Sequence, residues 1–299
     1  MKKKKKISVF TIILHGYFIL MCACFVIPLL LVVSASLTNE SWLTAGNGFS
    51  LIPKDFSTAA YVSAFHNGAR MVRAYLVTIA QAFLGTFLGC VIAGMAAYPL
   101  SRSNFRFRRP VTVIIFFTML FSAGMIPTYI IYAKYYGISN KFWVYILPGI
   151  AGGAWNTMVF RTFFKGLPES LFESARIDGA KELTIYFKIV LPLSTPVFAS
   201  LGFMMLVGKW NDYTTSMIYI RDENLYTLQY LLQRMMEEAA FLKNLSQTAM
   251  GNVSMGSADM PSESLKFAMC VIAAGPMLLI FPFFQKYFSQ GLTVGAVKG

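Results

Sequence analysis

Long apolar stretches alternate with shorter polar segments along most of the chain. Six of the stretches contain no Asp, Glu, Lys or Arg. A helix needs about 20 residues to cross the hydrocarbon core of a bilayer, and a charge at its middle is costly. The pattern therefore predicts an all-α integral membrane protein with six transmembrane helices. The predicted spans are 7–36, 74–100, 110–133, 142–160, 189–208 and 267–285.

The composition supports a membrane protein and excludes several other classes. Of the 299 residues, 56% are hydrophobic and only 13% are charged, whereas soluble domains carry about 25% charged residues. The four cysteines all lie in apolar runs, and no Cys-x-x-Cys pair stands near a histidine. We therefore expect neither a disulfide framework nor a metal site.

The chain begins with Met1 and five lysines, which lead into the first apolar run. A signal peptide can begin in the same way, but this run is about twice as long as the usual 7–15 residues. We therefore expect a basic cytoplasmic segment, residues 1–6, followed by an uncleaved first span. His15, within that span, is expected to be neutral.

The distribution of Lys and Arg predicts the orientation. With the N-terminus inside, the inside segments hold 16 basic and 4 acidic residues, and the outside segments hold 10 and 9. The inside segments are 1–6, 101–109, 161–188 and 286–299; the outside segments are 37–73, 134–141 and 209–266. Both termini are thus predicted to be cytoplasmic. The net charge of +13 needs no nucleic acid, because Arg102, Arg106, Arg108 and Arg109 fit a topology signal at an anionic lipid surface.

Motifs for catalysis are absent from the sequence. There is no Walker A motif, so we expect no ATP hydrolysis by a P-loop in this chain, and no Ser/His/Asp set points to an enzyme. The spans contain no paired carboxylates, which counts against a proton-coupled carrier. A secondary carrier or channel and a membrane enzyme or scaffold are the rival classes, and each predicts groups that the sequence lacks.

Two further features concern packing and the outside face. Gly85-x-x-x-Gly89 in the second span allows close approach between helices, and the glycines at 149, 152 and 153 are candidates for the same role. The loop 209–266 contains an amphipathic stretch, 225–245, followed by a segment rich in Ser, Gly and Asn. A loop of this length is usually functional or disordered.

The cytoplasmic segment between spans four and five has a mixed character that suits docking. Pro168 and Glu169 favour a helix N-terminus, an apolar stripe follows, and Gly179 permits a turn before a second short helix. The stripe consists of Leu171, Phe172, Ala175 and Ile177. An exposed apolar stripe flanked by charges is typical of a docking surface; a helix lying in lipid and a simple connector remain the alternatives.

This segment resembles the EAA loop of permeases from bacterial ATP-binding-cassette (ABC) importers. The family pattern is E-A-A, three residues, G, nine residues, I-x-L-P. Here it reads Glu173-Ser174-Ala175, then Gly179, then Ile189-x-Leu191-Pro192. The chain departs from the pattern at Ser174, which replaces one small residue with another.

The C-terminal tail narrows the resemblance to carbohydrate permeases of the MalG type. Residues 291–299 match the pattern G-L-T-x-G-x-V-K-G. The sequence Trp210-Asn211-Asp212 after span five is also similar to that group. The resemblance covers most of the chain from the first outside loop onward.

The resemblance implies a type I ABC importer permease fold over residues 7–299, in the bacterial cytoplasmic membrane. It makes the EAA segment a coupling helix on an ATPase subunit, with Glu173 paired to a basic residue of that subunit and Gly179 making the turn. The expected ATPase-coupling residues are Leu171, Phe172, Glu173, Ser174, Ala175, Ile177, Asp178 and Gly179. The tail residues expected to reach between the two ATPase subunits are Gly291, Leu292, Thr293, Gly295, Val297, Lys298 and Gly299.

The sequence is thus interpreted as one permease subunit of an ATP-driven, binding-protein-dependent importer of a sugar, and of an oligosaccharide in particular. The implied partners are a second permease chain, two ATPase subunits that hold ATP and Mg²⁺, and an extracytoplasmic solute-binding protein. Candidates for the substrate pathway are Tyr129, Asn156, Trp210 and Asn211, with helix packing as the alternative role for each. An importer for another solute remains the nearest alternative function.

Overall fold

The computed structural model describes residues 9–46, 48–66, 68–248 and 263–296. In this part of the chain the secondary structure is helical apart from one isolated bridge between Thr38 and Phe56. The chain divides into two compact units. Unit 1 comprises residues 1–68 and 232–275, and unit 2 comprises 69–231 and 276–299.

Unit 1 contains the first long helix and the described residues on either side of 249–262. Its elements are α1 (Val9–Ser36), α2 (Glu40–Thr44), α3 (Ala59–Ala64), most of α13 (Leu228–Thr248) and the first part of α14 (Glu263–Ala296). Large apolar side chains of α1 are exposed along most of its length. A soluble protein would bury such a surface, so α1 is suited to lipid.

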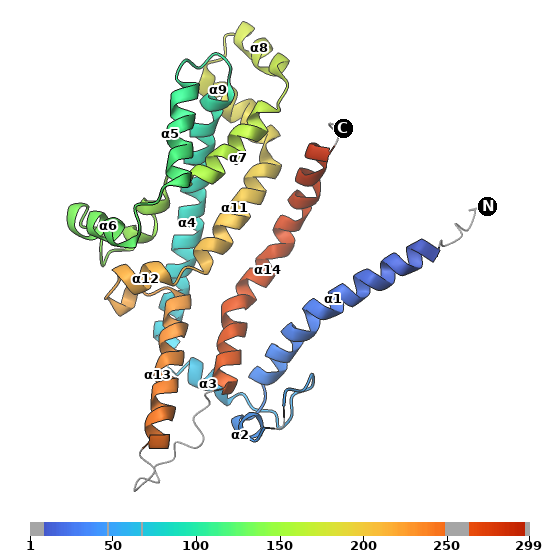
Figure 1. The fold of residues 1–299 in the computed structure, drawn as a ribbon, viewed down its shortest axis with the longest axis vertical. Helices are drawn as coiled ribbons and strands as arrows, with labels where there is room; N and C mark the ends of the chain where they lie inside the picture. The colour runs from blue at the N-terminus through green and yellow to red at the C-terminus, as the bar shows by residue number, and fades with distance from the viewer. Residues whose placement is uncertain (1–8, 47, 67, 249–262, 297–299) are drawn as a thin grey trace. The chain divides into compact units, whose positions relative to one another are not determined.

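Unit 2 contains α4 and the elements that surround it (Figure 1). Two long helices, α4 (Gly68–Ser101) and α11 (Thr195–Trp210), pack against one another through the small residues of α4. The other elements are α5 (Arg108–Leu120), α6 (Met125–Ile130), η1 (Ile131–Tyr135), η2 (Phe142–Tyr145), η3 (Leu147–Gly149), α7 (Ala154–Lys165), α8 (Glu169–Ile177), α9 (Glu182–Ile185), η4 (Tyr186–Val190), α10 (Leu191–Leu193), α12 (Thr214–Tyr219) and η5 (Glu223–Leu225).

Three described helices are long and apolar enough to cross a membrane, or up to five if each bent helix pair counts as one span. The three are α1, α4 and the first part of α14, which agree with the spans predicted at 7–36, 74–100 and 267–285. The stretches predicted at 110–133 and 189–208 are bent, with angles of 111° between α5 and α6–η1 and 79° between α9–α10 and α11. Gly124, at φ +86°, lies in the first break.

The stretch predicted as the fourth span, 142–160, is not one continuous helix. It consists of the 3-10 turns η2 and η3, followed by the start of α7 at Ala154. Gly152 and Gly153 stand between them at φ +73° and +79°, a backbone conformation that an α-helix does not use. These two glycines therefore interrupt the continuous helix that hydropathy alone predicts for this stretch.

The break at Gly152 packs against the second span. A Cβ atom on Gly152 would lie 2.4 Å from the carbonyl oxygen of Gly89, and a Cβ on Gly89 would meet the Met205 side chain. A Cβ on Gly85 would meet the side chain of Lys209. The small residues of α4 therefore receive the break and two side chains of α11, which is the close packing that the glycine spacing predicts.

A buried apolar core lies where α4 and α7 pack against the segment from α8 to α11. Its largest members are Phe160, Phe164, Phe172 and Tyr186, which are almost fully buried. Ring contacts join Phe160 to Phe164 and Phe198 at centroid distances of 5.8 and 4.4 Å. This core gives α8 a fixed support.

Candidate functional site: the α8 docking segment

The predicted helix–turn–helix between spans four and five is confirmed. Pro168 precedes α8, whose first residue is Glu169, and Gly179 makes the turn into α9 at φ +77°. An acid in the first turn and Arg176 in the last turn both suit the helix dipole. Glycine adopts this φ without a steric penalty, whereas other residues would incur one.

The apolar stripe of α8 is divided between two surfaces. Phe172 is fully buried and Ala175 nearly so, within the core cluster that includes Phe160 and Phe164. Leu171 is exposed, and Ile177 is 86% exposed. Half of the stripe that was expected to face a partner is therefore buried in the core, and the other half is exposed.

The exposed side of α8 carries the residues that a partner would meet. Glu173, Ser174 and Asp178 are exposed alongside Leu171 and Ile177. A surface that combines two apolar side chains with two carboxylates suits a partner with an apolar pocket rimmed by basic residues.

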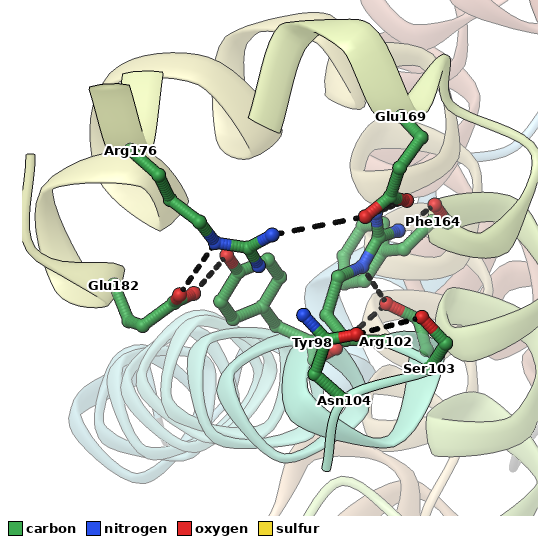
Figure 2. A network of polar contacts seen from close by, with 9 residues as sticks. Tyr98, Arg102, Ser103, Asn104, Phe164, Glu169, Arg176 and Glu182 are labelled. Atoms are coloured by element: carbon green, nitrogen blue, oxygen red, sulfur yellow. Dashed lines mark hydrogen bonds and ion pairs between the residues drawn. The ribbon is translucent and has the colours of Figure 1, made fainter. Parts of the chain in front are cut away.

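A network of polar contacts links α8 to the end of α4 (Figure 2). Glu169, the first residue of α8, accepts a hydrogen bond of 3.1 Å from Arg102, which follows α4 directly. Arg176, in the last turn of α8, donates to Glu182 at 3.1 Å and lies 3.8 Å from Glu169. The hydroxyl of Tyr98 donates to the other oxygen of Glu182 at 2.6 Å, so the contacts form a closed ring.

Arg102 is the most deeply placed member of the ring. Its side chain is 5% exposed, and its guanidinium lies 3.9 Å from the centroid of the Phe172 ring. It also donates to the backbone carbonyl of Phe164 and to the hydroxyl of Ser101. Burial lowers the pKa of Arg102, and the carboxylate of Glu169 acts against this shift.

The sequence interpretation of Arg102 as one of four equivalent topology signals is therefore incomplete. Its neighbours Arg106 and Arg109 are exposed, whereas Arg102 is a buried structural cation. Nothing in the sequence separates Arg102 from Arg106, since both are basic residues of one short polar segment. Tyr98, Glu182 and the pairing of Arg176 were not predicted from the sequence.

A pocket of about 390 Å³ borders the ring. Arg102, Arg176, Glu182 and Tyr98 contribute to its lining together with apolar side chains such as Met95. The pair between Arg176 and Glu182 therefore faces open space, while Arg102 also reaches into the core. The hydrogen bond to Glu182 raises the pKa of Arg176, which stays charged at any physiological pH.

The four candidates for the substrate pathway occupy different environments in unit 2. Tyr129 stacks on Tyr219 at 5.5 Å, and Asn156 donates to the carbonyl of Gly152 at 2.5 Å. Trp210 is buried, with 1% of its surface exposed, whereas Asn211 is exposed and accepts a hydrogen bond from Gln229. Tyr129, Asn156 and Asn211 thus each contact a different neighbour.

The C-terminal tail lies partly within the described residues. The backbone of Gly291–Ala296 continues α14, which ends at Ala296. Val297, Lys298 and Gly299 lie outside the described residues, as does most of the outside segment rich in Ser, Gly and Asn. Among the described residues there is no cluster of three or more His, Cys, Asp or Glu able to hold a metal.

Comparisons with known proteins place this geometry in a family. Residues 85–294 match the family described as "Binding-protein-dependent transport system inner membrane component". The polygalacturonan/rhamnogalacturonan transport system permease protein YtcP of Bacillus subtilis (strain 168) is 36% identical over 98% of this chain and 100% of that protein. Protein LplC of the same organism is 35% identical, over 92% of this chain and 90% of that protein.

A solved structure extends the similarity to the whole fold. It is the crystal structure of a bacterial ABC transporter involved in the import of the acidic polysaccharide alginate. The matching chain is 27% identical with a TM-score of 0.76, covering 96% of this chain and 99% of that chain. The resemblance to permeases of ABC importers is thereby confirmed. The chain belongs to the family of binding-protein-dependent transport system inner membrane components, and it is a transporter permease subunit rather than an enzyme.

Proposed function

We propose that this chain forms half of the translocation pathway of an ATP-driven oligosaccharide importer and that the ATPase subunits move α8 during their cycle of ATP binding and hydrolysis. The observation that carries the proposal is the divided surface of α8. Phe172 and Ala175 fix the helix in the core, while Leu171, Glu173 and Ile177 remain exposed. A helix that is anchored on one face and free on the other can transmit a push from a partner.

The proposed partners follow from membership in the family. They are a second permease chain, two ATPase subunits carrying ATP and Mg²⁺, and an extracytoplasmic binding protein. Six spans with both termini in the cytoplasm would place α8 on the side where the ATPase subunits are. The family's tail pattern supports a contact of residues 291–299 with the ATPase subunits.

The proposed mechanism is alternating access. ATP closes the ATPase dimer and brings the two docking helices together, which opens the permease pair outward; hydrolysis reverses the change. ATP can drive this cycle only because it binds the closed ATPase dimer more tightly than the open one. The chemistry thus belongs to the ATPase, and the permease acts as a lever.

An oligosaccharide with uronic acid units is the proposed cargo. YtcP is named for polygalacturonan and rhamnogalacturonan transport, and the solved transporter imports the acidic polysaccharide alginate. Other relatives are named for neutral sugars, among them the arabinooligosaccharides permease AraQ of Bacillus subtilis, at 27% identity. The more similar of the two named permeases thus points to an acidic cargo. Tyr129, Asn156, Trp210 and Asn211 remain the proposed pathway candidates from this chain.

Charge reversal at Glu173 tests the docking role. In the assembled transporter, Glu173→Lys should reduce uptake of oligogalacturonate by about tenfold or more, because it removes a proposed ion pair and adds a repulsive charge. Uptake into proteoliposomes and copurification of the ATPase subunits are the measurements. Maltotriose serves as the neutral comparison sugar.

The matched control is Glu237→Lys, the same charge reversal at an exposed position of α13, outside the docking segment. This variant should transport as well as the unaltered chain. Unimpaired uptake by Glu173→Lys would refute the docking role. Transport of maltotriose but not oligogalacturonate by the unaltered transporter would instead refute the proposed cargo alone.

A further inference from the structure

The docking helix α8 is connected to the end of α4 at both of its ends. Glu169, its first residue, meets Arg102, and Arg176, in its last turn, meets Glu182. Glu182 is held in turn by Tyr98, which lies one turn before Arg102. Figure 2 shows the contacts starting at the end of α4, passing along α8 and returning to α4. These links are additional to the covalent connections of α8 through α7 and α9.

The middle of α8 is joined to the same place. The guanidinium of Arg102 lies over the buried Phe172 ring at 3.9 Å, and the Tyr98 ring lies 6.4 Å from that of Phe172. A cation over an aromatic face is most favourable when both are shielded from water. Arg102 therefore contacts α8 through a charge at the helix start and through a ring at its centre.

The two halves of the ring differ in how readily they separate. Arg102 is 5% exposed and Glu169 50% exposed, so separating Arg102 from Glu169 and Phe172 would leave a buried cation without its carboxylate, which is costly. Arg176 and Glu182 are 29% and 58% exposed and border the pocket of about 390 Å³. A pair of this kind can open at little cost, because water replaces the lost partner.

We propose that Arg102 is a positioning residue that makes α4 move with α8, while the bond between Arg176 and Glu182 opens and closes during the cycle. The proposal rests on the proposed function, in which the ATPase moves α8. Of the four arginines in residues 101–109, Arg102 alone would transmit the movement of α8 into α4, the second span.

The chain offers a matched control for Arg102. Arg106 lies four residues later on the same segment, is exposed, and stands 5.9 Å from the ring of its own neighbour Phe107. Replacing either arginine by lysine keeps the charge and the topology signal. Lysine at 102 would lose the flat contact with Phe172 and the fork that reaches Glu169, Ser101 and Phe164 together.

The test follows the movement of α4 directly and requires no cargo. A single reporter cysteine, Val72→Cys, is placed at the exposed far end of α4, after the four native cysteines have been replaced. The assembled complex of both permeases and both ATPase subunits is studied in nanodiscs. The rate of alkylation at position 72 is measured with and without ATP, with vanadate blocking turnover, and ATP hydrolysis is measured without vanadate.

ATP should change the alkylation rate in the otherwise unaltered complex. Arg102→Lys should reduce that change by about fivefold or more, the scale of an ordinary coupling between sites, while ATP hydrolysis and ATPase copurification continue. Arg106→Lys should leave the change intact. Tyr98→Phe, which removes only the bond to Glu182, should retain most of the change, because that side of the ring is the one that opens.

Several outcomes would overturn the proposal. They are an alkylation rate that ATP does not change, an Arg102→Lys complex that responds like Arg106→Lys, and an Arg102→Lys complex that loses hydrolysis and response in equal proportion. The last result would mean a purely structural role. Failure of the proposed function has a different signature, namely a Glu173→Lys complex that retains its uptake and its ATP response.

Discussion

At Gly152 the backbone lies so close to the backbone of Gly89 that no side chain fits between them. Its φ of +73° is one that L-residues rarely adopt, and a Cβ there would lie 2.4 Å from the carbonyl oxygen of Gly89 and 2.6 Å from the Cβ of Ala93. Backbone atoms and a short Ala side chain cannot move aside as the end of a flexible side chain can. Conformation and space thus both require glycine at this position.

Replacing Gly152 with alanine should lower the stability of the chain by about 2 kcal/mol or more, since backbone strain alone costs about 1–3 kcal/mol. Thermal unfolding of the purified chain in detergent is the measurement. Gly208→Ala in α11, where nothing lies within 4 Å of the added Cβ, is the control and should unfold near the parent temperature. Equal unfolding temperatures for the two variants would contradict the argument.

Residue roles were predictable from the sequence where a single residue type carries the signal. The spacing of Gly85 and Gly89 indicates close packing, and Gly179 indicates a turn. Arg102 could not be separated from Arg106, because both look alike in a basic segment and only the path of α8 decides which is buried. The division of the apolar stripe likewise depends on the core that Phe172 enters.

At the scale of elements, the N-terminus of α14 is capped by a side chain from another part of unit 1. The carboxylate of Glu40, in α2, accepts hydrogen bonds from the backbone N–H groups of Glu263 and Ser264 and from the Ser264 hydroxyl. The first N–H groups of a helix have no partner within it, and the helix dipole favours a negative charge there. Glu40 therefore caps α14 from a distance of 223 residues along the chain.

Glu40→Gln keeps the shape of the cap but removes its charge, and it should destabilise unit 1 by about 1 kcal/mol. A lower midpoint of chemical unfolding in detergent would report the loss. Glu237→Gln, at an exposed position of α13, makes the same change without a helix end beside it and should have little effect. If both variants unfold at the same denaturant concentration, the cap contributes nothing.

Hydropathy identified the long helices well and the interrupted ones only as apolar stretches. The helices α1, α4 and α14 follow the predicted spans because an unbroken apolar run has no competing signal. The stretches 110–133 and 142–160 contain glycines whose positive φ values break the helix. A hydropathy average does not register such residues, since glycine is neither strongly polar nor strongly apolar.

At the scale of the whole molecule, the number of crossings determines the sides on which the termini lie. Five crossings would put the two ends on opposite sides of the membrane, whereas six put them on the same side. The described helices give three to five candidate spans by length and composition. The remaining crossing that we propose is the predicted fourth span, 142–160, in which two 3-10 turns lead into α7.

Green fluorescent protein, which fluoresces only on the cytoplasmic side of bacterial membranes when exported unfolded, should therefore fluoresce at either terminus. Alkaline phosphatase, which is active only outside, should be inactive at both. The lysines at the start and the excess of basic over acidic residues inside favour this result. An active phosphatase at one end only would reduce the crossings to an odd number.

The break near Gly152 also has a consequence for how the protein is made. Backbone groups freed by a break need partners at membrane depth, and the carbonyl of Tyr145 obtains one from the ammonium of Lys209, at 2.9 Å. Lys209 is synthesised more than sixty residues later. While the chain emerges from the ribosome, the segment around 142–153 therefore lacks that partner, and its stable entry into the bilayer should wait until the following span has been completed.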